Sequence, residues 1–221
     1  MVNSINDDYS AMKNTKSMIS TIYETLHAAD LDELEVIYKN WASDYEHDVI
    51  HLAGYVGHLI TTDLLLNYLK NKKARVLDAG CGTGLVGEIL HKNSFNNIEG
   101  VDFSEEMLSV ANQKKIYHAL RLVDLTKKLD YEDNSFDAIV CAGTFTCGHV
   151  GPEALKEMLR ITKKAGYICF TVRKQEWEAS PYMKIINDLE NTNAWHRLFH
   201  NSSEYNIKEG ISCQLCLYQV N

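Results

Sequence analysis

The chain has 221 residues, of which 45% are hydrophobic and 24% charged, and its formal net charge is −8. This length can bury a sizeable core, and the negative charge argues against nucleic acid, whose binding needs a basic face. No signal peptide and no stretch long and apolar enough to span a bilayer are found. We therefore expect a cytoplasmic monomer or homodimer that acts on a small molecule, without a nucleic-acid or membrane partner.

Two helices are predicted in the N-terminal part. The first follows Asp30, a suitable N-cap, and its apolar face repeats at steps of three and four. The residues of this face are Leu31, Leu34, Tyr38, Trp41 and Tyr45. The second helix should run from about residue 55 to 70. Its predicted inward face contains Val56, Leu59, Ile60, Leu64, Leu65 and Tyr68.

From Ala74 onward, strands and helices alternate. Strands are expected at 75–79, 97–102, 119–124, 136–142 and 167–172. Helices are expected at 85–92, after Ser104, at 153–164 and at 182–190. A turn at 207–211 leads into a last strand, Ile211–Val220, which closes a hairpin. This order predicts an α/β fold: a doubly wound, mostly parallel seven-stranded sheet with a C-terminal antiparallel hairpin strand. We expect one domain over 1–221, with an N-terminal helical cap at 1–70 and a Rossmann-like core at 71–221.

A glycine-rich loop follows the first of these strands. Asp78 ends the strand, and Gly80, Gly82 and Gly84 follow at alternate positions. Glycines allow backbone to approach a ligand closely, and a carboxylate ahead of them favours a cationic nucleoside such as S-adenosylmethionine. The same loop also contains Gly82-Thr83-Gly84-Leu85-Val86-Gly87, which fits a dinucleotide motif. The carboxylate speaks against that alternative, because it would repel a pyrophosphate.

Two further acids follow neighbouring strands. Asp102 ends the second strand and can accept hydrogen bonds from both ribose hydroxyls. Asp124 ends the third and can accept from an adenine amino group, next to a backbone N–H of Leu125, while Phe103 offers the adenine an apolar face. Each acid taken singly also has a structural interpretation, as a turn or helix-capping residue.

Two stretches resemble the class I S-adenosylmethionine-dependent methyltransferases: Val76-Leu77-Asp78-Ala79-Gly80-Cys81-Gly82-Thr83-Gly84 and Gly100-Val101-Asp102-Phe103-Ser104-Glu105-Glu106-Met107-Leu108. Two others, Tyr38-x-x-Trp41-Ala42-x-x-Tyr45 and Gly143-Thr144-Phe145-Thr146-Cys147-Gly148-His149-Val150, resemble the group named for the Williams–Beuren syndrome region. The resemblance implies S-adenosyl-L-methionine as cofactor. The contacts it implies are Asp78, Gly80, Cys81, Gly82, Asp102, Phe103, Met107, Asp124, Leu125, Ala142, Tyr38, Trp41 and Tyr45.

Tyr38, Trp41 and Tyr45 would lie on a helix that closes over the site, although plain core packing explains this aromatic stripe equally well. The chain departs from the family at one point: the usual Lys-Pro-Gly-Gly before the fifth strand is replaced by Lys164-Ala165-Gly166-Tyr167.

His149 is the candidate general base. It follows the fourth strand, and an ordinary pKa near 6.5 suits proton removal at neutral pH. The alternative is a histidine that orders its own loop. Cys213 and Cys216 form a C-x-x-C pair but lack a second ligand pair, and residues three apart on a strand point to opposite faces. We therefore expect no metal.

The expected function is transfer of a methyl group to a small molecule by in-line displacement. Two alternatives remain: methylation of a protein, and a non-catalytic module that binds S-adenosylmethionine and acts through a partner. The atom that is methylated is not specified by any motif.

Overall fold

The computed structural model describes residues 20–221 except 26, 29–30 and 147–149. Its strands are β1 (Val76–Ala79), β2 (Ile98–Asp102), β3 (Ala119–Leu122), β4 (Phe136–Phe145), β5 (Thr162–Arg173), β6 (Trp195–Asn206) and β7 (Ile211–Val220). Its helices are α2 (Leu31–Trp41), η1 (His47–Leu52), α3 (Gly57–Tyr68), α4 (Leu85–Lys92), α5 (Glu105–Gln113), α6 (Ala154–Ile161), α7 (Lys174–Ala179), α8 (Tyr182–Asn191) and η2 (Ile207–Glu209).

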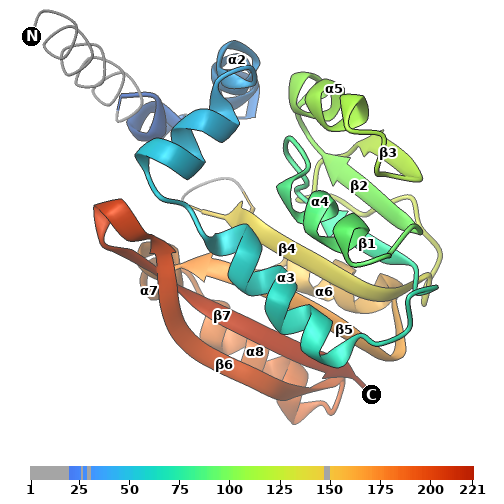
Figure 1. Ribbon diagram of the computed structural model, residues 1–221. Helices are drawn as coiled ribbons and strands as arrows, with labels where there is room; N and C mark the ends of the chain where they lie inside the picture. Colours follow the sequence, from blue (N-terminus) through green and yellow to red (C-terminus); the bar gives the residue numbers. More distant parts are fainter. Residues whose placement is uncertain (1–19, 26, 29–30, 147–149) are drawn as a thin grey trace, which may run out of the picture.

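The strands form one seven-stranded sheet in the order β3-β2-β1-β4-β5-β7-β6 (Figure 1). The first five strands in the chain pair in parallel. β7 runs antiparallel to both β5 and β6. The predicted α/β fold with an antiparallel C-terminal hairpin is therefore confirmed.

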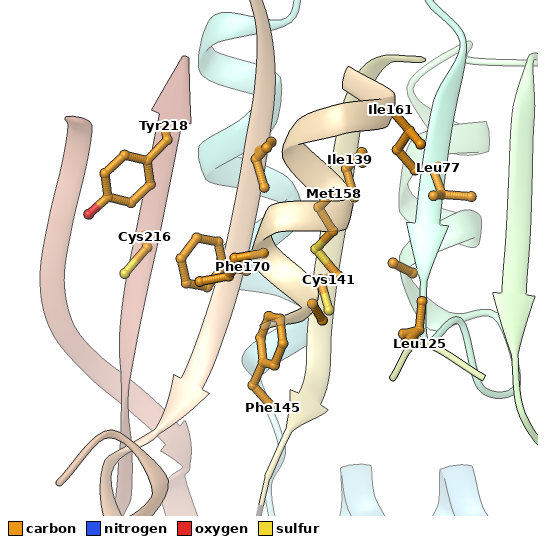
Figure 2. Packing of buried hydrophobic residues seen from close by; sticks show 14 of the residues in the cluster. Leu77, Leu125, Ile139, Cys141, Phe145, Met158, Ile161, Phe170, Cys216 and Tyr218 are labelled. Carbon is orange, nitrogen blue, oxygen red and sulfur yellow. The ribbon is translucent and has the colours of Figure 1, made fainter. Parts of the chain in front are cut away.

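Helices cover both faces of the sheet, and alternate residues of the strands point into two separate hydrophobic cores. On one face, Val76 packs with Leu65 of α3 and Leu90 of α4. On the other, Leu77 and Phe170 pack with α6 and α8. Figure 2 shows the second core, in which Met158 and Ile161 of α6 lie against side chains of β1, β4 and β5. Strands that are buried on both faces explain their continuous apolar sequences.

The fifth strand begins earlier than predicted. The helix expected at 153–164 ends at Ile161, and β5 starts at Thr162. Phe136 pairs with Thr162 but Ala138 pairs with Tyr167, so the extra residues form a bulge in β5. Ala165 adopts a φ of +59° in this bulge, in the left-handed region, which regular strands do not contain.

The inward face of α3 was predicted only in part: Leu65 is buried, and Ile60 and Leu64 pack against core clusters. Leu59 and Tyr68 are exposed, whereas Thr61 and Thr62 are fully buried. Their hydroxyls donate to the carbonyls of Gly57 and His58 at 2.6 and 2.7 Å, which satisfies their polarity inside the protein. Buried threonines satisfied in this way leave no signal in a hydrophobicity pattern.

The N-terminal helices meet the C-terminal hairpin at one end of the sheet. α2 lies over the end toward which β1, β2 and β4 point (Figure 1). Tyr55 forms an isolated antiparallel bridge with Asn206, the last residue of β6. The Lys208 ammonium also donates to the His51 carbonyl. No helix in the described part of the chain is both long and apolar enough to cross a membrane.

Candidate functional site

A pocket of about 890 Å³ lies beyond the carboxyl ends of the parallel strands. Its walls come from the segments that follow β1, β2 and β3, from the end of β4, and from the N-terminal helices. β1 and β4 are neighbours in the sheet but are joined to strands on opposite sides. This is the switch point at which open α/β sheets bind ligands.

The glycine loop after β1 forms the floor of this pocket. Gly80 has a φ of +75°, and its N–H donates to the Val101 carbonyl at 2.8 Å. A Cβ at Gly80 would lie 2.0 Å from the Thr144 hydroxyl, so only glycine fits there. Gly82 differs, because no atom lies within 4 Å of its hypothetical Cβ. The backbone at Gly82 is therefore open to close approach by a ligand.

Asp78 lies behind this loop and is fully buried. The Tyr117 hydroxyl donates to its Oδ2 at 2.6 Å, while its Oδ1 is buried with no hydrogen-bond partner. Burial raises the pKa of Asp78 from 3.8 to about 7, and the hydrogen bond from Tyr117 opposes this rise. A carboxylate in this state gains from a nearby cation, which would compensate for its lost hydration.

Asp102 joins the glycine loop to the end of β2. Its Oδ2 accepts from the Gly82 N–H at 2.7 Å, and its Oδ1 accepts from the Ser104 N–H at 3.0 Å. Burial raises the pKa of Asp102, and these backbone donors oppose the rise. An ionised carboxylate has about four acceptor positions, so Asp102 can still accept hydrogen bonds from hydroxyls in the pocket that it lines.

Apolar side chains form the end of the pocket near β2 and β3. Phe103, Met107 and Leu125 all line it. Ser104 caps α5 as predicted, accepting from the Met107 N–H at 3.3 Å. This cap places Met107 in the first turn of α5, where its side chain is buried against the pocket. The surface so formed suits a flat apolar ring.

Asp124 lies two residues beyond the end of β3. Its Oδ1 accepts from the Thr126 N–H at 2.8 Å, and its Oδ2 pairs with Lys127 at 3.0 Å. Bonds to Thr126 and Lys127 lower its pKa, against the opposing effect of its partial burial. Asp124 therefore stabilises a turn, as its structural interpretation predicted. The same residue also lines the pocket, so the two interpretations are compatible.

The aromatic stripe predicted for one helix is interrupted, because α2 ends at Trp41 and a turn at residues 42–44 precedes Tyr45. Tyr38 and Tyr45 line the main pocket, and the Tyr38 ring meets Phe103 at 5.6 Å between centroids. Trp41 instead lines an adjoining pocket, and its indole N–H donates to Asp48 at 2.8 Å. The stripe therefore both packs as a core cluster and faces the site.

The structure brings most of the sequence-predicted site residues to the main pocket. Those that line it are Tyr38, Tyr45, Gly80, Cys81, Gly82, Asp102, Phe103, Met107, Asp124, Leu125 and Ala142. Asp78 is behind the loop, and Trp41 is in the adjoining pocket. The candidate base His149 lies outside the described residues, as does Cys147.

Several lining residues carry no sequence motif. Tyr55 and His58 reach the main pocket from the turn before α3 and from its first turn. Burial lowers the pKa of His58 to about 4, so it is uncharged at neutral pH. Tyr117, the partner of Asp78, follows α5. Long-range packing alone places these residues at the site.

The adjoining pocket of about 590 Å³ extends from the main one toward the C-terminal hairpin. Five residues line both pockets: Tyr38, Tyr45, Tyr55, Gly143 and Thr146. Arg173, Tyr205 and Asn206 belong to the adjoining pocket alone. The two pockets are therefore adjacent, and Gly143, near the end of β4, belongs to the boundary between them.

The C-x-x-C pair has no metal-binding geometry. Cys213 belongs to the core under the N-terminal helices, and Cys216 belongs to the core shared with α6 and α8. In the part of the chain that the structure describes, no group of three or more His, Cys, Asp or Glu side chains is placed to hold a metal ion.

Sequence and structure comparisons identify the family. The family model for a methyltransferase domain matches residues 77–170. Methyltransferase-like protein 27 of Homo sapiens is 33% identical over 180 residues, covering 76% of this chain and 71% of the human protein. The chain belongs to the class I S-adenosylmethionine-dependent methyltransferases.

Other matches of this methyltransferase agree with its fold and cofactor. The demethylmenaquinone methyltransferase of Bacillus licheniformis is 33% identical over 141 residues, covering 61% of this chain and 58% of that protein. Magnesium protoporphyrin IX methyltransferase from Synechocystis, solved with bound S-adenosylmethionine, superposes with a TM-score of 0.58 at 18% identity. That match covers 75% of this chain and 81% of the Synechocystis chain. Membership of this family, rather than the likeness to that structure, identifies S-adenosylmethionine as the cofactor of the methyltransferase.

Proposed function

We propose that this methyltransferase transfers a methyl group to a small-molecule acceptor held in the adjoining pocket. The observation that carries the proposal is that the two pockets are adjacent and share five lining residues, Gly143 among them. The adjoining pocket is concave and is lined mainly by aromatic and other uncharged side chains. A pocket of this kind suits a small molecule better than a protein surface, for which an open acidic groove would be expected.

The cofactor residues are proposed from their positions in the main pocket. Asp102 accepts the ribose hydroxyls, and Phe103, Met107 and Leu125 contact the adenine, with Asp124 at its amino edge. Gly80, Cys81 and Gly82 contact the methionine part, with the Asp78 carboxylate behind them. Ala142, Tyr38 and Tyr45 complete this pocket. Trp41 supports the N-terminal segment that covers it, from the side of the adjoining pocket. S-adenosylmethionine supplies a methyl group that its sulfonium already activates.

The chain's own residues then have to align the acceptor and exclude water. Alignment within about 3–3.5 Å of the reacting carbon is the main requirement of an in-line displacement. Tyr55 lies against the β4 end, 2.8 Å from the position that a Cβ of Gly143 would take, and can hold the acceptor there. We propose that His149 removes a proton where the acceptor has to lose one.

The proposed arrangement treats residues 1–221 as one methyltransferase domain, with a helical cap at 1–70 over a core at 71–221. The contact between Tyr55 and Asn206 supports this, since it joins the cap to the core hairpin. The net charge of −8 supports an enzyme that works without nucleic acid or an anionic membrane surface. We also propose that it is cytoplasmic and acts as a monomer or homodimer.

The test is methylation of fractionated cell extract with labelled S-adenosylmethionine. Extract filtered to remove macromolecules and the retained protein fraction are assayed separately. We expect label in the small-molecule fraction. Label in the protein fraction alone would support the protein methyltransferase instead. Cofactor binding without transfer to either fraction would support a non-catalytic module.

A further inference from the structure

We propose that Arg173 forms a carboxylate-binding subsite in the adjoining pocket, and that the methyl acceptor is a small carboxylic acid with a flat, apolar body. This inference rests on the proposed function, since it names the acceptor class of the same site. Nothing in the sequence motifs points to Arg173.

Arg173 is placed at the pocket by the end of β5. It is the last residue of that strand, and it pairs with Cys213 on β7. β5 lies beside β4 in the sheet, and the β4 residue Gly143 lines both pockets. Arg173 therefore projects from the strand next to the one that separates the acceptor from the methyl donor.

Among the residues that the structure describes, the Arg173 guanidinium has no hydrogen-bond or ion-pair partner. Its Nε is buried with no hydrogen bond, and it forms no ion pair within the described part of the chain. Three other arginines, Arg75, Arg160 and Arg197, pair with carboxylates at 2.6–3.0 Å. An arginine remains protonated at any physiological pH. A partly buried, unpaired guanidinium is unfavourable unless an anion joins it.

No other residue that the structure places in the lining of this pocket is charged. An entering anion would thus meet one cation and no acid. A carboxylate matches the fork of N–H donors on an arginine and can form two parallel hydrogen bonds with it. This geometry fixes both the position and the orientation of the acid.

The remaining walls define the body of the acceptor. Tyr55 and Tyr205 meet edge to face, with ring centroids 5.0 Å apart. Both hydroxyls point to the β4 end, 2.8 and 3.5 Å from the position that a Cβ of Gly143 would take. Trp41 lines the same pocket. Aromatic faces with two hydroxyls at one edge suit a planar molecule whose polar atom points toward Gly143.

S-adenosylmethionine carries a carboxylate of its own, which is the competing partner for Arg173. Arg173 does not line the main pocket, where the glycine loop lies. It lies on the far side of Gly143 with Tyr205 and Asn206. We therefore assign it to the acceptor, and the experiment measures both ligands.

The experiment compares Arg173→Met with Lys174→Met. The control removes the same charge one residue away, from a side chain that is 58% exposed and lies outside both pockets. Each protein is first titrated with S-adenosylhomocysteine by calorimetry. The saturated complexes are then titrated in chloride buffer with benzoate, 4-hydroxybenzoate and phenylacetate, and with the amide of each acid.

We expect wild type and Lys174→Met to bind at least one acid, and Arg173→Met to bind that acid at least tenfold more weakly. The matching amide should bind weakly and equally to all three proteins. The proposal is overturned if no acid binds the wild-type complex, if acid and amide bind alike, or if Arg173→Met weakens S-adenosylhomocysteine alone. If Arg173→Met does not fold, the comparison of acid with amide on wild type decides.

The extract assay separates this proposal from the proposed function. Methylation of neutral small molecules alone would leave the proposed function intact and overturn the Arg173 subsite. Acid binding that depends on Arg173, together with label only in protein, would contradict the proposed function and leave an anion subsite in place.

Discussion

The protonation of Asp78 should make the stability of the ligand-free enzyme fall as the pH rises. Its pKa is 3.8 in an unfolded chain and about 7 in the folded protein. The folded state therefore holds a proton that the unfolded state releases between these two values. The stability that Asp78 contributes is fully present below pH 3.8 and is lost as the pH rises through about 7. Each pKa unit corresponds to about 1.4 kcal/mol, so the whole change is about 4 kcal/mol.

The assay is urea denaturation of wild type and Asp78→Asn from about pH 5 to about pH 8. Over this range the free energy of unfolding of wild type should fall by about 2.5 kcal/mol relative to the variant. The difference between the two proteins cancels the contributions of the other titratable groups. These include His58, whose lowered pKa makes its contribution to stability rise with pH. S-adenosylmethionine is cationic, so its affinity should rise over the same pH range in wild type but not in Asp78→Asn.

Parallel stability profiles for the two proteins would refute this reasoning. If Asp78→Asn does not fold, Tyr117→Phe provides a second test. It removes the hydrogen bond that favours the ionised carboxylate, so the loss of stability should move to higher pH. An unchanged profile in Tyr117→Phe would contradict the proposed cause of the shift.

The other predictions concern affinity, turnover and packing. Asp102→Ala should weaken S-adenosylmethionine binding at least a hundredfold in calorimetry, because charge-assisted hydrogen bonds are lost; unchanged affinity would contradict the ribose assignment. His149→Ala should lower turnover on the true acceptor and spare cofactor affinity, and normal turnover would exclude it as the base. Gly80→Ala should destabilise the protein by about 2–4 kcal/mol, since its Cβ meets Thr144 at 2.0 Å and its φ is +75°. Gly82→Ala, with open space at its Cβ, should lose less stability in the same denaturation assay and more cofactor affinity.

Local signals were sufficient to predict most of the fold. The helix predicted at 85–92 has the observed bounds of α4, and Ser104 caps α5 through the expected hydrogen bond. These features depend on hydrophobic spacing and on a capping side chain, both of which the sequence displays. The early start of β5 at Thr162 was missed, because a bulge opposite Phe136 is a property of strand pairing and not of the segment itself.

The residues of the candidate site likewise fall into those that local signals predict and those that they do not. The strand-end acids and the glycine loop could be predicted, because parallel strands bring their carboxyl ends to one edge. Tyr117 could not, since it is buried against Asp78, 39 residues away in the chain. Arg173 and Tyr205 could not be predicted either, because they line a pocket only once β4 and the N-terminal helices pack beside them. The sequence thus indicates the cofactor more directly than the acceptor.

The bridge between Tyr55 and Asn206 has a consequence for how the enzyme assembles and diversifies. The neighbouring contact of Lys208 with His51 joins residues 157 positions apart, so we expect it to form after more local contacts have reduced its loop-closure cost. The acceptor pocket should therefore be completed late in folding, after the nucleotide-binding half. Because its walls are drawn from distant parts of the chain, substitutions there can alter the proposed acceptor specificity while the cofactor pocket stays unchanged.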